Sequence, residues 1–138
     1  MRASCRSATI LPRVATLRDL IKRDVLAVAP EDTLGEAAEK MHAERIGWAI
    51  VSDYGRMIGI LTERDILRAV AGRTHSSEAR VREWMTPDPV TAAPDTAPEE
   101  ALKTMLDGGF RHLPVVEDGR PIGVVSMRHV ARAVGADT

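Results

Sequence analysis

The stretch that decides the fold is GILTERD, residues 59–65, because the chain contains a second version of it, GVVSMRH, at residues 123–129. The two versions are 64 positions apart (123 − 59 = 64), and this offset holds without a gap between residues 17–70 and residues 81–134. One structural unit therefore occurs twice in the chain. Identical pairs at this offset include Arg18/Arg82, Ala29/Ala93, Pro30/Pro94, Glu36/Glu100, Ala37/Ala101, Met41/Met105, Val51/Val115, Gly55/Gly119, Ile58/Ile122 and Arg64/Arg128.

Each copy begins with a short extended segment and a helix. Residues 25–28 and 90–92 are expected to supply the first strand of each copy. Thr33 and Glu36 have the spacing of a capping box and precede apolar residues at helical spacing, and Thr96 and Glu99 repeat this pattern. Both copies are therefore predicted to continue as an amphipathic helix.

Each copy then predicts a hairpin and a second helix. The β-rich runs AIVSDYGRMIGIL (49–61) and LPVVEDGRPIGVV (113–125) each contain a glycine where a tight turn needs a positive φ. Helices are predicted at 63–71 and 127–135. The residues expected to face inward on these helices are Ile66, Leu67 and Val70 in the first copy, and Val130, Ala131 and Val134 in the second.

The sequence therefore predicts a mixed α/β (α+β) fold built from two β-α-β-β-α repeats, residues 14–71 and 81–135. Residues 72–80 read as a linker, residues 1–13 as a flexible N-terminal arm and residues 136–138 as a C-terminal tail. A unit of this size is marginally stable alone, because small domains bury too little of their surface. We therefore expect the two sheets to pack on each other with pseudo-two-fold symmetry, with crevices where the repeats meet.

Composition excludes several classes of protein. The 138 residues are 44% apolar and 28% charged, with no apolar run long enough to cross a bilayer, so a soluble protein is expected. A net charge of −1 gives no overall attraction for nucleic acid or membrane, and the single cysteine, Cys5, is compatible with a cytoplasmic location. Catalytic motifs and clustered metal ligands are not recognisable, so neither an enzyme nor a metal site is expected.

The end of GILTERD allows two interpretations. Thr62 and Asp65 have capping-box spacing, so the pair could serve only to begin the second helix. A strand that ends in a helix N-terminus also forms an anion site, where a carboxylate could bind both hydroxyls of a ribose. The second interpretation points to a nucleotide, and the residues alone leave both open.

The duplicated order of elements, the run LPVVEDGRPIGVVS and the phrase GILTERD resemble a tandem pair of cystathionine beta-synthase (CBS) domains, also called a Bateman module. The resemblance covers about residues 14–134. The family signature is glycine, two apolar residues, Thr or Ser, any two residues and Asp, and residues 59–65 match it throughout. Relatives such as the gamma subunit of AMP-activated protein kinase bind adenine nucleotides, and others bind S-adenosylmethionine.

The resemblance also implies which residues bind the ligand. The first site would combine Thr62, Arg64 and Asp65 with Thr86, Pro89, Thr91, Phe110, Arg111 and His112. The second site would combine Lys22, Val25, Ala27, Ile46 and Gly47 with Ser126, Arg128 and His129.

The two sites are not expected to be equal. His129 departs from the signature, because an imidazole cannot accept two hydroxyl hydrogens as a carboxylate can. Trp48 stands where the other copy has His112, and it is expected to crowd the rim of the second site. We therefore expect one good site and one weak site.

Two functions follow as hypotheses. The first is a regulatory module that senses AMP, ADP, ATP or S-adenosylmethionine in the inter-repeat cleft and signals to an effector protein in trans, by conformation or self-association. It would need no cofactor, and the resemblance implies a homodimer. The alternative is a ligand-free dimerisation or scaffold protein with vestigial clefts. Nucleic-acid binding is not expected.

Overall fold

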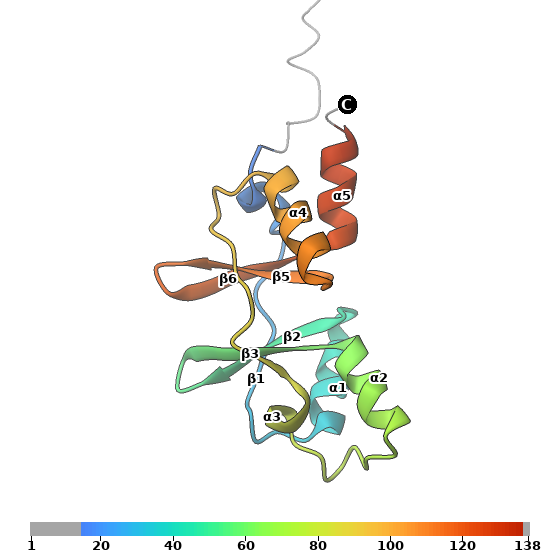
Figure 1. The fold of residues 1–138 in the computed structure, drawn as a ribbon. Coiled ribbons are helices and arrows are strands. Elements are labelled where there is room, and N and C mark those ends of the chain that lie inside the picture. The colour runs from blue at the N-terminus through green and yellow to red at the C-terminus, as the bar shows by residue number, and fades with distance from the viewer. Residues whose placement is uncertain (1–14, 137–138) are drawn as a thin grey trace, which may run out of the picture.

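The computed structural model describes residues 15–136, so the predicted arm at residues 1–13 and residues 137–138 of the predicted tail lie outside the described residues. The last described helix ends at Ala136, the first residue of the predicted tail. Two sheets are stacked, and each has its own helices (Figure 1). This arrangement confirms the predicted fold class.

The first sheet has four strands in the order β1-β2-β3-β4, and the second pairs β5 with β6. The strands are β1 (Ala27–Val28), β2 (Trp48–Asp53), β3 (Arg56–Thr62), β4 (Thr86–Pro87), β5 (His112–Glu117) and β6 (Arg120–Ser126). β1 runs parallel to β2, and an isolated parallel bridge between Ala92 and Val115 takes the same place in the second repeat. Both predicted hairpins form, β2 with β3 and β5 with β6.

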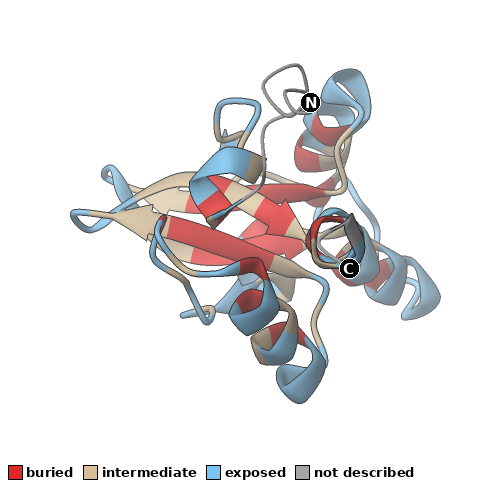
Figure 2. Ribbon diagram, turned by 90° about the horizontal axis from the view of Figure 1, so that it is seen from above, coloured by how far each residue is buried: buried red, intermediate tan, exposed pale blue. Residues whose placement is uncertain are grey.

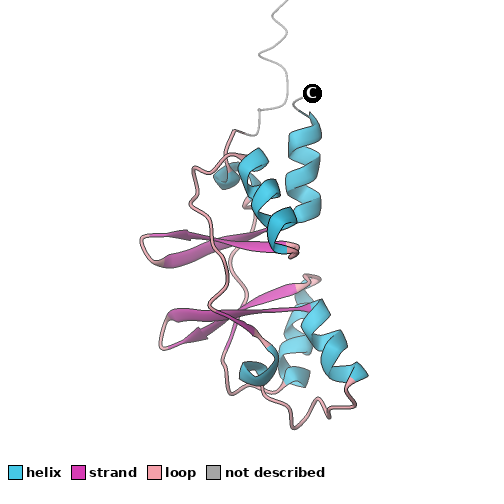
Figure 3. Cartoon of the chain, in the orientation of Figure 1, coloured by secondary structure: helices cyan, strands magenta, loops and turns pink. Residues whose placement is uncertain are grey.

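The helices complete the predicted order in both repeats. They are the 3-10 helix η2 (Leu17–Leu20) and the α-helices α1 (Leu34–Glu44), α2 (Glu63–Ala71), α3 (Val81–Trp84), α4 (Pro98–Gly108) and α5 (Met127–Ala136). α1, α2, α4 and α5 lie toward one side of the molecule, and the hairpin turns point to the other (Figures 1 and 3).

The capping prediction is right for α1 and wrong for α4. Thr33 N–H donates to Glu36 Oε1 at 2.8 Å, and Glu36 N–H donates to Thr33 Oγ1 at 3.1 Å. α4 instead begins at Pro98, with Ala97 as its N-cap and no side-chain cap. Proline has a fixed φ and no N–H to satisfy, so it can begin a helix without the hydroxyl of Thr96.

The inward face predicted for α2 is partly wrong. Leu67 and Val70 are 68% and 61% exposed. Asp65 and Ala69, four residues apart, form the buried side of the helix, and Ile66 is half-buried beside them. Since residues 67 and 70 share a different face of an α-helix, α2 presents apolar side chains in two directions.

The inward face predicted for α5 is closer to the structure. Val130 is fully buried, and Val134 packs against the same core. Ala131 is exposed, and Ala133 is buried in its place.

The two repeats exchange their opening segments, which the sequence analysis did not predict. Leu17 precedes the first sheet but is fully buried in the core of the second repeat, where its N–H donates to Thr96 O at 3.0 Å. Val81 is fully buried in the core of the first repeat, where its N–H donates to Asp32 O at 2.9 Å. Each core is therefore closed by residues from the other repeat.

The glycine that opens each copy of the repeated phrase permits this exchange. A Cβ on Gly59 would lie 2.8 Å from Thr86 O, and a Cβ on Gly123 would lie 2.6 Å from Cγ2 of Ile21. Atoms this close would clash, so only glycine lets the crossing segments lie against β3 and β6. For the first repeat, this contact is continued by the pairing of β3 with β4.

The sheets pack face to face, as predicted. Trp48, Ile50 and Ile60 form a buried cluster on the first sheet, and Val124 of the second sheet packs against it. Figure 2 shows buried residues along the stacked strands and exposed outer faces on the helices. Within residues 15–136, no helix combines the length and the apolar character needed to span a bilayer.

The exchange predicts that core truncations act on the opposite repeat. Leu17→Ala should destabilise the protein by about 2–5 kcal/mol, because it leaves a cavity in a packed core. Hydrogen exchange should then accelerate in α4, β5 and β6, whereas Val81→Ala should accelerate exchange in α1, β2 and β3. Each variant is the control for the other, and loss of protection in the variant's own sequence repeat would contradict the exchange.

Candidate functional site

A cavity of about 600 Å³ opens between the two repeats. The first repeat contributes the end of β3 and the start of α2, and the second contributes β4, the loop after it and the segment between α4 and β5. Its lining residues are Ile60, Thr62, Glu63, Arg64, Asp65, Arg68, Thr86, Asp88, Pro89, Val90, Gly109, Phe110, Arg111 and His112. The cavity therefore lies at the junction that the exchanged segments create.

Local backbone geometry brings the second repeat to the cavity. Asp88 has a φ of 48°, and its N–H donates to Ile58 O at 3.1 Å, which turns the chain after β4 beside β3. Gly109 has a φ of 73° and ends α4, so that Phe110 and Arg111 lie along the cavity. A left-handed residue is a common helix end, and glycine adopts it without strain.

Asp65 forms the predicted helix cap and also lines the cavity. Its Oδ2 accepts hydrogen bonds from Thr62 N–H at 2.9 Å and from Thr62 Oγ1 at 3.1 Å, so the carboxylate caps α2. The same residue lines the cavity, although it is only 4% exposed. The carboxylate is thus held in a fixed orientation at a helix N-terminus that faces a cavity.

Arg68 completes the arrangement around Asp65 and is absent from the predicted site. Its Nη1 donates to Asp65 Oδ1 at 2.9 Å, and its guanidinium carbon lies 5.5 Å from the centre of the Trp84 ring. The signal for this contact was present in the sequence, since residues three apart on a helix are neighbours. The other lining residues that sequence analysis missed are Ile60, Glu63, Asp88, Val90 and Gly109.

The structure brings together most residues predicted for the first site. Thr62, Arg64 and Asp65 line the cavity from the first repeat, and Thr86, Pro89, Phe110, Arg111 and His112 line it from the second. Thr91 is not among the lining residues and is exposed. The role of all these residues in binding remains a prediction.

Charges of both signs meet in this lining. Arg64, Arg68 and Arg111 supply positive charge, and carboxylates come from Glu63, Asp65 and Asp88. Burial lowers the pKa of His112 below its ordinary value; Glu63 opposes this shift, and Arg111 reinforces it. The neutral imidazole is therefore favoured, and it can donate one hydrogen bond and accept another.

The residues predicted for the second site lie in a different environment. Val25 and Ile46 pack against the buried cluster that contains Trp48. Trp48 is only 7% exposed. The backbone N–H of His129 donates to Ser126 Oγ at 3.3 Å, so the hydroxyl of Ser126 caps α5. His129 stands at the position equivalent to Asp65 but has an imidazole in place of the carboxylate. The remaining members of this set, Lys22, Ala27 and Arg128, are exposed, and Gly47 is half-buried.

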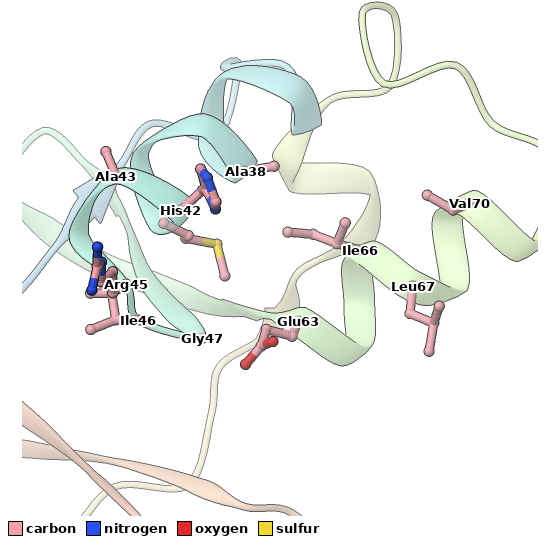
Figure 4. Close-up of a pocket in the computed structure, with 11 residues that line it drawn as sticks. Ala38, His42, Ala43, Arg45, Ile46, Gly47, Glu63, Ile66, Leu67 and Val70 are labelled. Atoms are coloured by element: carbon pink, nitrogen blue, oxygen red, sulfur yellow. The ribbon is translucent and has the colours of Figure 1, made fainter.

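A second hollow is a groove between α1 and α2, of about 1090 Å³ (Figure 4). It is lined by Ala38, Met41, His42, Ala43, Arg45, Ile46, Gly47, Glu63, Ile66, Leu67 and Val70. Glu63 lines both this groove and the inter-repeat cavity.

Among the described residues, no group of three or more His, Cys, Asp or Glu side chains could hold a metal ion.

Comparison with known proteins gives a consistent result. The CBS domain model matches residues 17–72 and again residues 81–136. An uncharacterized 17.7 kDa protein of Acidianus ambivalens is 39% identical over 129 residues, which cover 92% of this chain and 74% of that protein. A relative from Methanocaldococcus jannaschii is 30% identical, and the match spans only 43% of its length.

Solved structures agree with the fold. A CBS-domain-containing protein from Agrobacterium tumefaciens is 35% identical, with a TM-score of 0.82 over 91% of this chain and 97% of that one. A CBS domain protein from Pyrobaculum aerophilum, solved as a complex with AMP, is 27% identical, with a TM-score of 0.80 over 88% of this chain and 96% of that one. The double family match, the paired sheets and these neighbours together establish that the chain belongs to the CBS domain family, as a tandem pair.

Proposed function

We propose that this protein is a regulatory module that binds an adenosine-containing ligand, AMP, ADP, ATP or S-adenosylmethionine, in the cavity between its repeats. The observation that carries the proposal is the fixed carboxylate of Asp65 beside Thr62, at the N-terminus of α2, in a cavity lined by both repeats. A carboxylate can accept both hydroxyls of a ribose, and a helix N-terminus favours a phosphate. A volume of about 600 Å³ suits a ligand of this size.

The comparison with the protein from Pyrobaculum aerophilum supports the ligand class, since that protein was solved with AMP. The three arginines of the lining offer partners for a phosphate, and the aromatic ring of Phe110 offers apolar surface for a base.

Signalling would follow from the position of the cavity. A ligand that contacts α2 and the segment between α4 and β5 at once would stabilise one relative arrangement of the repeats. The coupling energy would be the difference in its affinity for the two arrangements, typically about 1–3 kcal/mol. The module would act on an effector protein in trans, by conformation or self-association.

One observation favours the alternative, a ligand-free scaffold. The carboxylate of Asp65 already has partners on both oxygens, Thr62 on one and Arg68 on the other. A vestigial cleft could keep Asp65 only as a helix cap. The two functions differ in whether the side chain matters beyond capping.

Asp65→Asn separates them, because asparagine keeps one oxygen for the helix cap and loses the second acceptor. A panel of AMP, ADP, ATP, NAD and S-adenosylmethionine should include a ligand that stabilises the wild type by RT ln(1 + [L]/Kd), about 2.7 kcal/mol at a hundredfold excess over Kd. Asp65→Asn should lose this stabilisation in thermal-shift and calorimetric measurements.

Asp19→Asn is the matched control, since Asp19 Oδ2 also accepts from a backbone cap, Thr16 N–H at 3.2 Å, and Asp19 is not among the cavity-lining residues. This variant should keep the full ligand effect. A wild type that responds to none of the five compounds would support the scaffold instead.

The groove between α1 and α2 supports self-association as the second part of the proposal. Leu67 and Val70 line this groove and are largely exposed. In the second repeat, Leu106 on α4 is 61% exposed. It stands at the position equivalent to His42, which lines the groove in the first repeat (106 − 64 = 42). α1, α2 and α4 lie toward the same side of the molecule (Figure 1), and each repeat has exposed apolar residues on these helices. A second copy that presents the same face would cover both surfaces in a two-fold dimer.

Leu67→Glu should weaken such a dimer, because it places a charge in the apolar interface. Light scattering after size exclusion should show a larger monomer fraction than in the wild type at equal concentration. Tyr54→Glu is the control, since Tyr54 is 98% exposed at a hairpin turn on the opposite side of the molecule. Equal molar masses for both variants and the wild type would contradict this interface.

A further inference from the structure

Arg68 limits what Asp65 can bind. A carboxylate has about four acceptor positions, and on Asp65 hydrogen bonds already occupy three of these. Thr62 donates two to Oδ2, and Arg68 donates one to Oδ1. One acceptor position is left, whereas the two hydroxyls of a ribose need two. A ribose can therefore engage Asp65 with both hydroxyls only if one of these donors moves, and the exposed side chain of Arg68 is the donor that has room to do so.

We propose that Arg68 leaves Asp65 for the phosphate of the incoming ligand, so that the site selects adenosine phosphates over unphosphorylated adenosine. This inference rests on the proposed function and assigns Arg68 as the residue that determines its ligand class. The two ribose hydroxyls take the acceptor position that is already free on Asp65 and the one that Arg68 vacates. The phosphate supplies the anion that Arg68 loses, through a charge-assisted hydrogen bond.

The surroundings of Arg68 suit such an exchange. Its side chain is 58% exposed, whereas that of Asp65 is 6% exposed, so the guanidinium is the partner that has room to move. Arg68 lines the same cavity as Asp65, which keeps it within the space that a ligand would enter.

Trp84 gives the guanidinium a support that does not depend on Asp65. Its ring lies 5.5 Å from the guanidinium carbon, and Trp84 itself packs against the core of the first repeat. An arginine can stay over such an aromatic face while its hydrogen-bonding partner changes.

Unphosphorylated adenosine would not complete the exchange. Its ribose can displace Arg68, but it offers the released guanidinium no anion, and the salt bridge is lost without replacement. AMP differs from adenosine only by the phosphate, so the two compounds isolate this effect. Arg64 and Arg111 also line the cavity, but within residues 15–136 the arginine that hydrogen-bonds Asp65 is Arg68, so the contacts of the other two would not be linked to ribose binding in this way.

Calorimetric titration of AMP and adenosine against Arg68→Ala tests the inference. The wild type should prefer AMP, and the ratio of the two dissociation constants should fall about tenfold or more in Arg68→Ala. The fall should come from weaker AMP binding, with adenosine binding unchanged or tighter. Arg68→Lys keeps the charge but not the forked geometry, so it should give an intermediate ratio of the two dissociation constants. If Arg68→Ala does not fold, Arg68→Lys takes its place in the test.

Arg132→Ala is the matched control, because Arg132 is the exposed counterpart of Arg68 on α5 (132 − 68 = 64). It should keep the wild-type ratio. If the wild type binds AMP and the Arg68 variants keep its ratio, or lose both ligands equally, the exchange is wrong while the proposed function stands. If the wild type binds neither compound, the proposed function for adenosine phosphates fails, and the exchange fails with it.

Discussion

The exchange of opening segments is the constraint on which the rest of the structure depends. Leu17 closes the core of the second repeat and Val81 closes that of the first, so separating the repeats would expose both side chains. The crossing also carries β4 to the edge of the first sheet, beside the start of α2. The cavity forms at this place, with walls from both repeats. Its geometry is therefore tied to the relative position of the repeats, which is the property that a sensor needs.

Duplication has produced two junctions of different character. At one, the strand–helix connection contains Asp65, and His112 lines the cavity beside it. At the other, the equivalent positions hold His129 and Trp48, and the indole of Trp48 is buried in the contact between the sheets. The same backbone plan thus supports two tasks. One junction places a carboxylate in the lining of a cavity, and the other adds apolar contact between the sheets.

The sequence predicts the local elements well, because periodicity, turn glycines and capping residues are local signals. It could not predict the exchange, since Leu17 and Val81 are both apolar and fit either core equally well. The exposure of Leu67 and Val70 on α2 was missed for a related reason. Helical periodicity shows which apolar residues share a face of a helix, but it does not show whether another element covers that face. Nearly all residues expected at the first site line one cavity, and Arg68 was missed although its spacing of three residues from Asp65 on the helix allowed the contact.

The proposed function depends most on a contact between Asp65 and a ribose inside the cavity between the repeats. A crystal structure of the protein grown with AMP tests it most directly. Both ribose hydroxyls should lie within hydrogen-bonding distance of the Asp65 carboxylate, with residues of both repeats around the nucleotide. A structure in which AMP is absent from this cavity, and Asp65 still bonds only Thr62 and Arg68, would contradict it.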